Sequence, residues 1–306
     1  MADTPPTPSS SHAIVFARRS ASTVFLWGLV SAVFFSRSSW AYLGLLGLLS
    51  IIATVEYFRL LRAAGVRGFP RFGILLATGY CGTLHAFFLH GQAPPADLEA
   101  VAVVVAVAGA FALQLRQPIR GVESLLAVAA TVLGLVYIAV LFNFAARLIF
   151  LVPGGSATPG TIGEPGAYLL LWLLAVTKFT DMGAYITGSL IGRHKMIPHV
   201  SPGKTWEGFG GALLFAQLAG CGLYAAFPAP LAVLGSARHV IALGLLLAVL
   251  AVIGDLAESV LKRALGAKDS GRMLPGIGGA LDLIDSICFT APALYFYLKW
   301  FLLPTA

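Results

Sequence analysis

The stretch SLLAVAATVLGLVYIAVLFNFAA, residues 124–146, contains no charged side chain. It is longer than the roughly 18 apolar residues that indicate a helix crossing a bilayer. Inside a membrane the backbone must satisfy its own hydrogen bonds, and an α-helix does so within one segment. With its flanks, this stretch predicts a transmembrane helix over residues 124–150.

The rest of the 306-residue chain has the same character. Hydrophobic residues make up 58% of the sequence and charged residues 11%, and the mean hydropathy is +0.88. A soluble domain carries about a quarter charged residues. The short alternating segments of a β-barrel are absent. We therefore predict an all-α, polytopic integral membrane protein.

Apolar windows predict about nine transmembrane helices. They lie near residues 22–36, 39–58, 72–90, 98–115, 124–150, 166–186, 208–227, 231–261 and 279–301. The window at 231–261 is so long that its helix must be tilted, broken or extended beyond the bilayer.

The chain divides into three regions. Residues 1–20 form a Pro/Ser/Thr-rich tail that we expect to be disordered. No convincing cleavage site follows Arg18 and Arg19, so we expect the first helix to be retained. N-terminal helices then occupy residues 21–165, and the polar motifs fall in a C-terminal region, residues 166–306.

The basic residues predict the orientation. Most of the 20 Lys and Arg residues lie before the first helix or in alternate loops, whereas the opposite loops GQAPPADLE and PGGSATPGTIGEPG contain none. Because cytoplasmic loops are rich in Lys and Arg, we expect a cytoplasmic N-terminus in the cell (inner) membrane.

Residues 178–211, KFTDMGAYITGSLIGRHKMIPHVSPGKTWEGFGG, form a first polar constellation. Lys178 and Asp181 can pair at the end of a helix. Lys204 precedes the next helix, where backbone N–H groups favour anions. Gly-Lys-Thr resembles the end of a P-loop, but Pro198 stands where the first glycine belongs and we expect no preceding strand, so we reject a Walker A site.

The second constellation runs from residue 254 to 285. Its polar residues fall on shared helix faces: Asp255, Glu258, Ser259 and Lys262 at i, i+3, i+4 and i+7, and Asp282 and Asp285 at i, i+3. Carboxylates offer hard oxygen ligands for Mg²⁺, and the cations can hold phosphate groups. Structural ion pairs that close the bundle are the alternative. The PGIGG run disfavours it, because glycines permit a close backbone approach that ion pairs do not need.

Other polar residues fit structural roles. We expect His85 and His90 to be structural or solvent-facing, and Glu56 to be an interfacial anchor beside Arg59. The cysteines Cys81, Cys221 and Cys288 have no paired spacing and indicate small core side chains.

Both constellations resemble the phosphatidate cytidylyltransferase (CDP-diacylglycerol synthase) family, strongly over residues 178–290. The matching positions of the C-terminal signature are Ser259, Lys262, Arg263, Lys268, Asp269, Leu274, Pro275, Gly278, Gly279, Asp282 and Asp285. Those of the upstream block are Asp181, Gly183, Ala184, Tyr185, Gly188, Gly192, Ser201, Pro202, Lys204, Thr205, Glu207 and Gly208. Two departures are Ile277 in place of the family's histidine and Leu283 in place of its arginine.

The resemblance implies that CTP and phosphatidate give CDP-diacylglycerol and pyrophosphate at the cytoplasmic face, with no nucleic acid as partner and with a homodimer as the assembly. We predict that Asp255, Asp282 and Asp285 bind one or two metal ions, Mg²⁺ among them. The predicted catalytic residues are Asp181, Lys204, Lys262, Asp282 and Asp285. The predicted substrate-binding residues are Ser201, Thr205, Glu207, Ser259, Arg263, Lys268, Asp269, Gly278 and Gly279.

Two alternatives stay open. The departures at Ile277 and Leu283 allow a transferase acting on another lipid phosphate, or an inactive homologue. An ion-coupled transporter could also use buried acids, but it would show paired broken helices in two related halves. Here the polar motifs are confined to one membrane face and one end of the chain.

Overall fold

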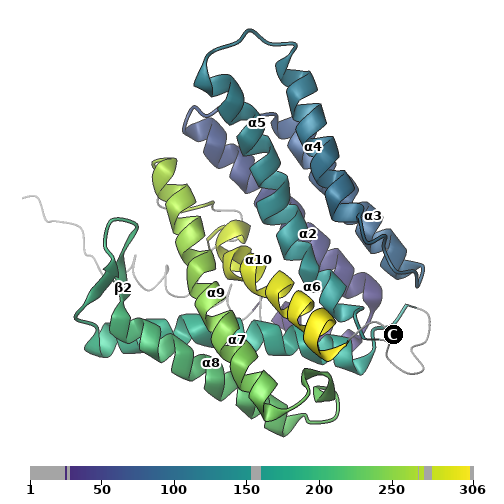
Figure 1. The fold of residues 1–306 in the computed structure, drawn as a ribbon, viewed down its shortest axis with the longest axis vertical. Helices are drawn as coiled ribbons and strands as arrows, with labels where there is room; N and C mark the ends of the chain where they lie inside the picture. The colour runs from purple at the N-terminus through teal and green to yellow at the C-terminus, as the bar shows by residue number, and fades with distance from the viewer. Residues whose placement is uncertain (1–24, 26–27, 153–159, 268, 272–277, 304–306) are drawn as a thin grey trace, which may run out of the picture.

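A computed structural model describes residues 25, 28–152, 160–267, 269–271 and 278–303, and within them the chain is almost entirely helical (Figure 1). The helices are α2 (Ser39–Ala63), α3 (Pro70–Leu89), α4 (Leu98–Gln114), α5 (Val122–Gly134), α6 (Leu141–Ile149), α7 (Glu164–Ile191), α8 (Trp206–Ala226), α9 (Ala237–Ala264) and α10 (Ala280–Tyr297). Short π-helices η1 (Leu135–Val140) and η3 (Leu298–Leu302) continue α5 and α10, and a 3-10 turn, η2 (Ala232–Leu234), precedes α9.

Seven helices in the described part of the chain are long and apolar enough to cross a membrane. They are Ser39–Ala63, Pro70–Leu89, Val122–Ile149, Glu164–Ile191, Trp206–Ala226, Ala237–Ala264 and Ala280–Leu302. The predicted span at 98–115 corresponds to α4, a shorter apolar helix of 17 residues. Of the span predicted at 22–36, residues 28–36 are helical, and most of the remainder lies outside the described residues.

The prediction of an all-α chain is wrong at one place. Strands β1 (Lys195–Ile197) and β2 (Ser201–Thr205) form an antiparallel hairpin between α7 and α8. The strands are three and five residues long, and their sequences, Lys-Met-Ile and Ser-Pro-Gly-Lys-Thr, contain no apolar alternation that would predict them. The strand β2 contains the Gly-Lys-Thr sequence and leads directly into α8.

Helix α10 lies at the centre of the molecule, in contact with α2, α6, α7 and α9 (Figure 1). Most of its residues are buried, including the polar side chains of Asp285, Ser286 and Thr290. Because α10 contacts helices from both halves of the chain, its first turn can receive side chains from either half.

Helices α7 and α8 pack closely because glycines remove side chains from their interface. A Cβ atom on Gly208 would lie 2.9 Å from the carbonyl oxygen of Ala184, and one on Gly183 would lie 2.5 Å from that of Gly211. Trp172 of α7 donates a hydrogen bond from Nε1 to the carbonyl oxygen of Gly220, at 2.9 Å. This pair holds the hairpin beside the ends of α9 and α10.

The N-terminal half has its own polar core. His85 bonds to Asn143 through Nε2 and Oδ1 at 2.9 Å, and the Asn143 amide donates to the carbonyl oxygen of Ala139 at 2.7 Å. His85 is therefore structural, as predicted. Cys81 and Cys288 are buried free thiols and Cys221 is half-buried, which confirms them as small core side chains.

Candidate active site

A cavity of about 500 Å³ opens where α7, the hairpin, α8, α9 and α10 meet. Seven of the predicted site residues line it: Asp181, Ser201, Lys204, Thr205, Asp255, Asp282 and Asp285. The two polar constellations, which lie far apart in the sequence, therefore face one cavity.

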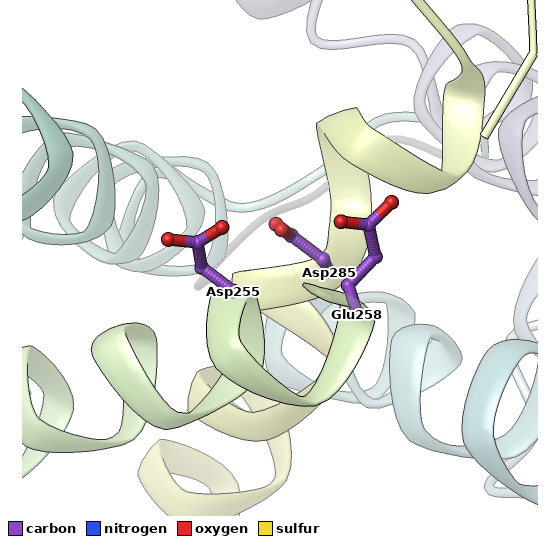
Figure 2. Close-up of side chains that lie close together, drawn as sticks. All are labelled: Asp255, Glu258 and Asp285. Atoms are coloured by element: carbon purple, nitrogen blue, oxygen red, sulfur yellow. The ribbon is translucent and has the colours of Figure 1, made fainter. Parts of the chain in front are cut away.

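Three carboxylates gather at the α9–α10 side of this cavity. Figure 2 shows the Asp285 carboxylate of α10 between those of Asp255 and Glu258, which lie one helical turn apart on α9. One oxygen from each of the three residues lies within 4.8 Å of the others. Glu258 and Asp285 are buried, so their charges are largely shielded from water.

Gly254 brings the two helices close enough for this grouping. A Cβ atom at this position would lie 2.8 Å from the carbonyl oxygen of Asp285 and 2.8 Å from the Cα atom of Ser286. The backbone of α10 therefore passes directly over a residue with no side chain, next to the turn that carries Asp255.

The three carboxylates fit a divalent cation. Carboxylate oxygens are hard ligands of the kind that Mg²⁺ prefers. Glu258 Oε1 is buried and has no hydrogen-bond partner among the described residues. A buried acceptor without a partner is costly, and a bound cation would offset that cost. The other oxygen, Oε2, pairs with Lys262 at 2.5 Å.

Asp282, predicted as a metal ligand, has other partners. Its Oδ1 accepts a hydrogen bond from Lys262 at 2.7 Å. Its Oδ2 accepts from the Ser270 hydroxyl at 2.6 Å and from the Gly279 N–H at 2.9 Å. Asp282 thus caps the start of α10 and ties it to α9, and the group of carboxylate oxygens within 4.8 Å of one another contains Glu258 together with Asp255 and Asp285. Glu258 was on the predicted helix face with Asp255, and that spacing is the signal that points to it.

Positive charges surround the carboxylates. Lys204 forms an ion pair with Asp255 and so connects the hairpin to α9. Lys178 lies 3.7 Å from Asp181 and also donates to the carbonyl oxygen of Leu283 at 3.3 Å. Among the residues that line the cavity, Lys204 carries the positive charge.

The base of the hairpin is fixed by Glu207. Its carboxylate accepts hydrogen bonds from the N–H groups of Arg193 and His194, at 3.1 and 3.2 Å, and pairs with the His194 ring at 2.6 Å. Thr205 accepts from the Gly208 N–H at 3.1 Å and caps α8. Glu207 therefore orients the strand that carries Lys204, and it does not line the cavity.

The remaining predicted residues that the structure describes do not line the cavity: Lys262, Ser259, Arg263, Asp269, Gly278 and Gly279. Arg263 and Asp269 are exposed. Arg263 donates to the carbonyl oxygen of Ala267 at 3.2 Å. Lys268 lies outside the described residues, as does Ile277, one of the two departures from the family motif.

Glu56 was missed as a residue of this region. The expectation of an interfacial anchor is wrong, because the residue is only 1% exposed. Its Oε2 accepts a hydrogen bond from the N–H of Leu281 at 3.0 Å, at the start of α10. A carboxylate near the end of an apolar span was the one signal in the sequence.

The chain resembles known proteins over two different lengths. The sequence model of the cytidylyltransferase family matches residues 17–301. The chain is 32% identical over 278 residues to the uncharacterized protein YnbB of Escherichia coli, covering 90% of this chain and 85% of that protein. It is 44% identical over 135 residues to the phosphatidate cytidylyltransferase of Brucella suis, covering 44% of this chain and 48% of that enzyme.

A second enzyme gives the same picture. The phosphatidate cytidylyltransferase of Bacillus subtilis is 39% identical over 142 residues, covering 46% of this chain and 51% of that enzyme. The chain thus matches about half the length of these curated phosphatidate cytidylyltransferases.

Proposed function

Because the chain belongs to the cytidylyltransferase family, we propose that it condenses CTP with phosphatidate to give CDP-diacylglycerol and pyrophosphate. An oxygen of the lipid phosphate attacks the α-phosphorus of CTP, the bond from that phosphorus to the bridging oxygen breaks, and pyrophosphate leaves with the electron pair. Positioning and neutralisation of charge then dominate catalysis.

The carboxylate grouping beside Lys204 is the observation that carries this proposal. Asp255, Glu258 and Asp285 would hold Mg²⁺, which would supply positive charge to offset that of the phosphate oxygens. Five carboxylates (Asp181, Asp255, Glu258, Asp282 and Asp285) lie in or beside the cavity, and four of them form ion pairs with three ammonium groups, those of Lys178, Lys204 and Lys262. If all are ionised, two negative charges are left over, which suits a divalent cation.

The protein's own groups would bind and orient the substrates. Lys204 can hold a phosphate oxygen of CTP, and the Ser201 hydroxyl can donate a hydrogen bond to another, because both line the cavity. The N-terminal ends of α8 and α10 lie at the same cavity, and helix N-termini favour anions. Lys262 and Glu207 would act indirectly, by fixing Glu258 and the hairpin.

The location of the cavity supports one water-soluble and one lipid substrate. It lies where long apolar helices end and a polar hairpin begins. We infer about nine spans from the apolar windows of the sequence, and a cytoplasmic N-terminus and a cytoplasmic reaction site in the inner membrane from the distribution of Lys and Arg. We also infer a homodimer from the family resemblance, which cross-linking of the protein in native membranes would test.

One assay tests the reaction. Purified protein with Mg²⁺, labelled CTP and phosphatidate should release CDP-diacylglycerol and pyrophosphate in equal amounts. Asp285→Asn should reduce the rate to background, because it removes a carboxylate from the centre of the group in Figure 2. Glu164→Gln is the matched control, since Glu164 pairs with Arg37 and does not line the cavity. Absence of product with every lipid phosphate and nucleotide would contradict the enzyme proposal.

A different lipid phosphate is the second candidate. Leu283 replaces the family's arginine and its side chain packs against the apolar core, and a relative that matches 90% of the chain has a name that states no substrate. Repeating the assay with polyprenyl phosphates and other lipid phosphates distinguishes the candidates. A higher kcat/KM for one of them than for phosphatidate would favour it.

A further inference from the structure

Glu56 is a buried carboxylate of α2 that reaches the start of α10. Its exposed fraction is 1%, and Oε2 accepts the N–H of Leu281 at 3.0 Å. The two residues lie 225 positions apart in the chain, in the N-terminal and C-terminal halves. This hydrogen bond therefore joins the two halves at the helix that carries Asp282 and Asp285.

The first turn of α10 needs such partners. The first N–H groups of a helix have no acceptor within it, and a negative charge near them is favourable. Asp282 Oδ2 accepts the N–H of Gly279, at 2.9 Å, and Glu56 accepts that of Leu281. Two carboxylates from different parts of the chain thus fix the turn that precedes Asp285.

Two glycines make room for Glu56. A Cβ atom on Gly279 would lie 2.7 Å from Glu56 Oε2, and one on Gly271 would lie 2.5 Å from Oε1. Side chains at these positions would push the carboxylate away from α10. Gly271 and Gly279 therefore allow the Glu56 carboxylate to approach the backbone closely. This is a second role for Gly279, which the sequence predicted to bind substrate.

The helix that carries Glu56 is itself firmly held. The adjacent Tyr57 is fully buried and donates a hydrogen bond from its hydroxyl to the carbonyl oxygen of Ala130, at 2.8 Å. Phe58 packs where Gly73 has no side chain, since a Cβ atom there would overlap the Phe58 ring. A fixed α2 can transmit its position to α10 through Glu56.

We propose that Glu56 is a positioning residue, which sets the first turn of α10 and thereby places Asp285 against Asp255 and Glu258. The effect on turnover rests on the proposed function. The effect on α10 itself does not, because it follows from the hydrogen bond and the packing.

The test compares Glu56→Ala and Glu56→Gln with the wild type. Hydrogen exchange should rise in residues 278–286 of Glu56→Ala and stay unchanged in α3. Turnover and Mn²⁺ affinity should fall roughly ten- to hundred-fold, the usual cost of losing a group that orients a metal ligand. Glu56→Gln keeps an acceptor oxygen for Leu281, so it should retain more of both. Glu123→Ala, which removes an exposed carboxylate from α5, should match the wild type.

The possible outcomes are distinct. The proposal is overturned if amide hydrogen exchange in residues 278–286 is as slow in Glu56→Ala as in the wild type. It is also overturned if exchange in Glu56→Ala rises equally along the whole chain while turnover per folded molecule is unchanged. If the wild type itself makes no CDP-lipid, the proposed function fails. The exchange and Mn²⁺ measurements would still decide the role of Glu56.

Discussion

Glu258 and Asp282 compete for the role of third carboxylate beside Asp255 and Asp285. Glu258 has an oxygen with no partner among the described residues, whereas both oxygens of Asp282 accept hydrogen bonds. Removing Glu258 takes away a group that can bind a cation. Removing Asp282 breaks the cap of α10 and its link to Lys262.

Glu258→Gln should therefore weaken metal binding by at least roughly ten- to hundred-fold, the cost of losing even a group that only orients a ligand, because one of the three proposed charged ligands becomes a neutral amide. Compared with Glu258→Gln, Asp282→Asn should change metal affinity less and should lower the thermal stability of the protein more, because it removes the cap of α10. Titration of purified protein with Mn²⁺, followed by electron paramagnetic resonance, measures the first effect without any substrate. A larger loss of affinity in Asp282→Asn than in Glu258→Gln would restore Asp282 as the ligand.

At the scale of the helices, the contact between α9 and α10 depends on Gly254. The atoms that a Cβ at this position would meet include the backbone of α10, which cannot rotate away. Gly254→Ala should destabilise the protein by about 1–3 kcal/mol, the usual cost of overpacking. It should also reduce turnover, because separating the helices moves Asp285 away from Asp255. Thermal unfolding in detergent and the rate per folded molecule measure the two effects.

Gly222→Ala is the matched control for this prediction. Gly222 lies within α8, and a Cβ atom there would meet nothing within 4 Å. Alanine is the better helix former by roughly 1 kcal/mol, so this variant should be as stable as the wild type or more stable. If Gly254→Ala unfolds at the same temperature as Gly222→Ala and reacts as fast as the wild type, close packing of α9 and α10 is not required.

At the scale of the whole molecule, apolar length predicted most of the helices well. The window at 231–261 proved to be a helix of 28 residues, Ala237–Ala264, preceded by a 3-10 turn. At 1.5 Å per residue it is about 42 Å long, so it is tilted or extends past a bilayer core of about 30 Å. Hydropathy placed the end of α7 at residue 186, whereas the helix runs on to Ile191. Its last turn includes polar residues such as Ser189, which an apolar window does not count as part of a span.

The site was only partly predictable, for a physical reason. Helical periodicity indicates which residues share a face, so it placed Asp255 with Glu258. It does not indicate which helices will contact each other, so it could not pair Glu56 with Leu281 or give Glu258 preference over Asp282. Those contacts depend on tertiary packing at Gly254, Gly271 and Gly279, where each glycine alone fits many roles.

Whether α4 crosses the membrane decides whether the α3–α4 loop and the hairpin lie on the same side of it. With 17 residues, α4 is about 26 Å long, slightly less than the bilayer core. It packs along α3 (Figure 1), and its Glu99 is held by Arg147 of α6 at 2.7 Å. We therefore expect α4 to span. In that case α4, the α5–α6 helix and α7 separate the α3–α4 loop from the hairpin, and these two segments lie on opposite sides.

Cysteine labelling in cells tests this arrangement. In a Cys221→Ser background, where the other two cysteines are buried, a membrane-impermeant maleimide should label Gln92→Cys in intact cells. It should label Lys195→Cys only after the membrane is permeabilised, because the hairpin belongs to the basic, cytoplasmic face. Both positions are exposed, so a difference between them reports on sidedness rather than on burial. If both positions are labelled in intact cells, or neither is, they lie on one side of the membrane and α4 is excluded as a span. If only Lys195→Cys is labelled in intact cells, the whole molecule has the opposite orientation and its proposed CTP site does not face the cytoplasm.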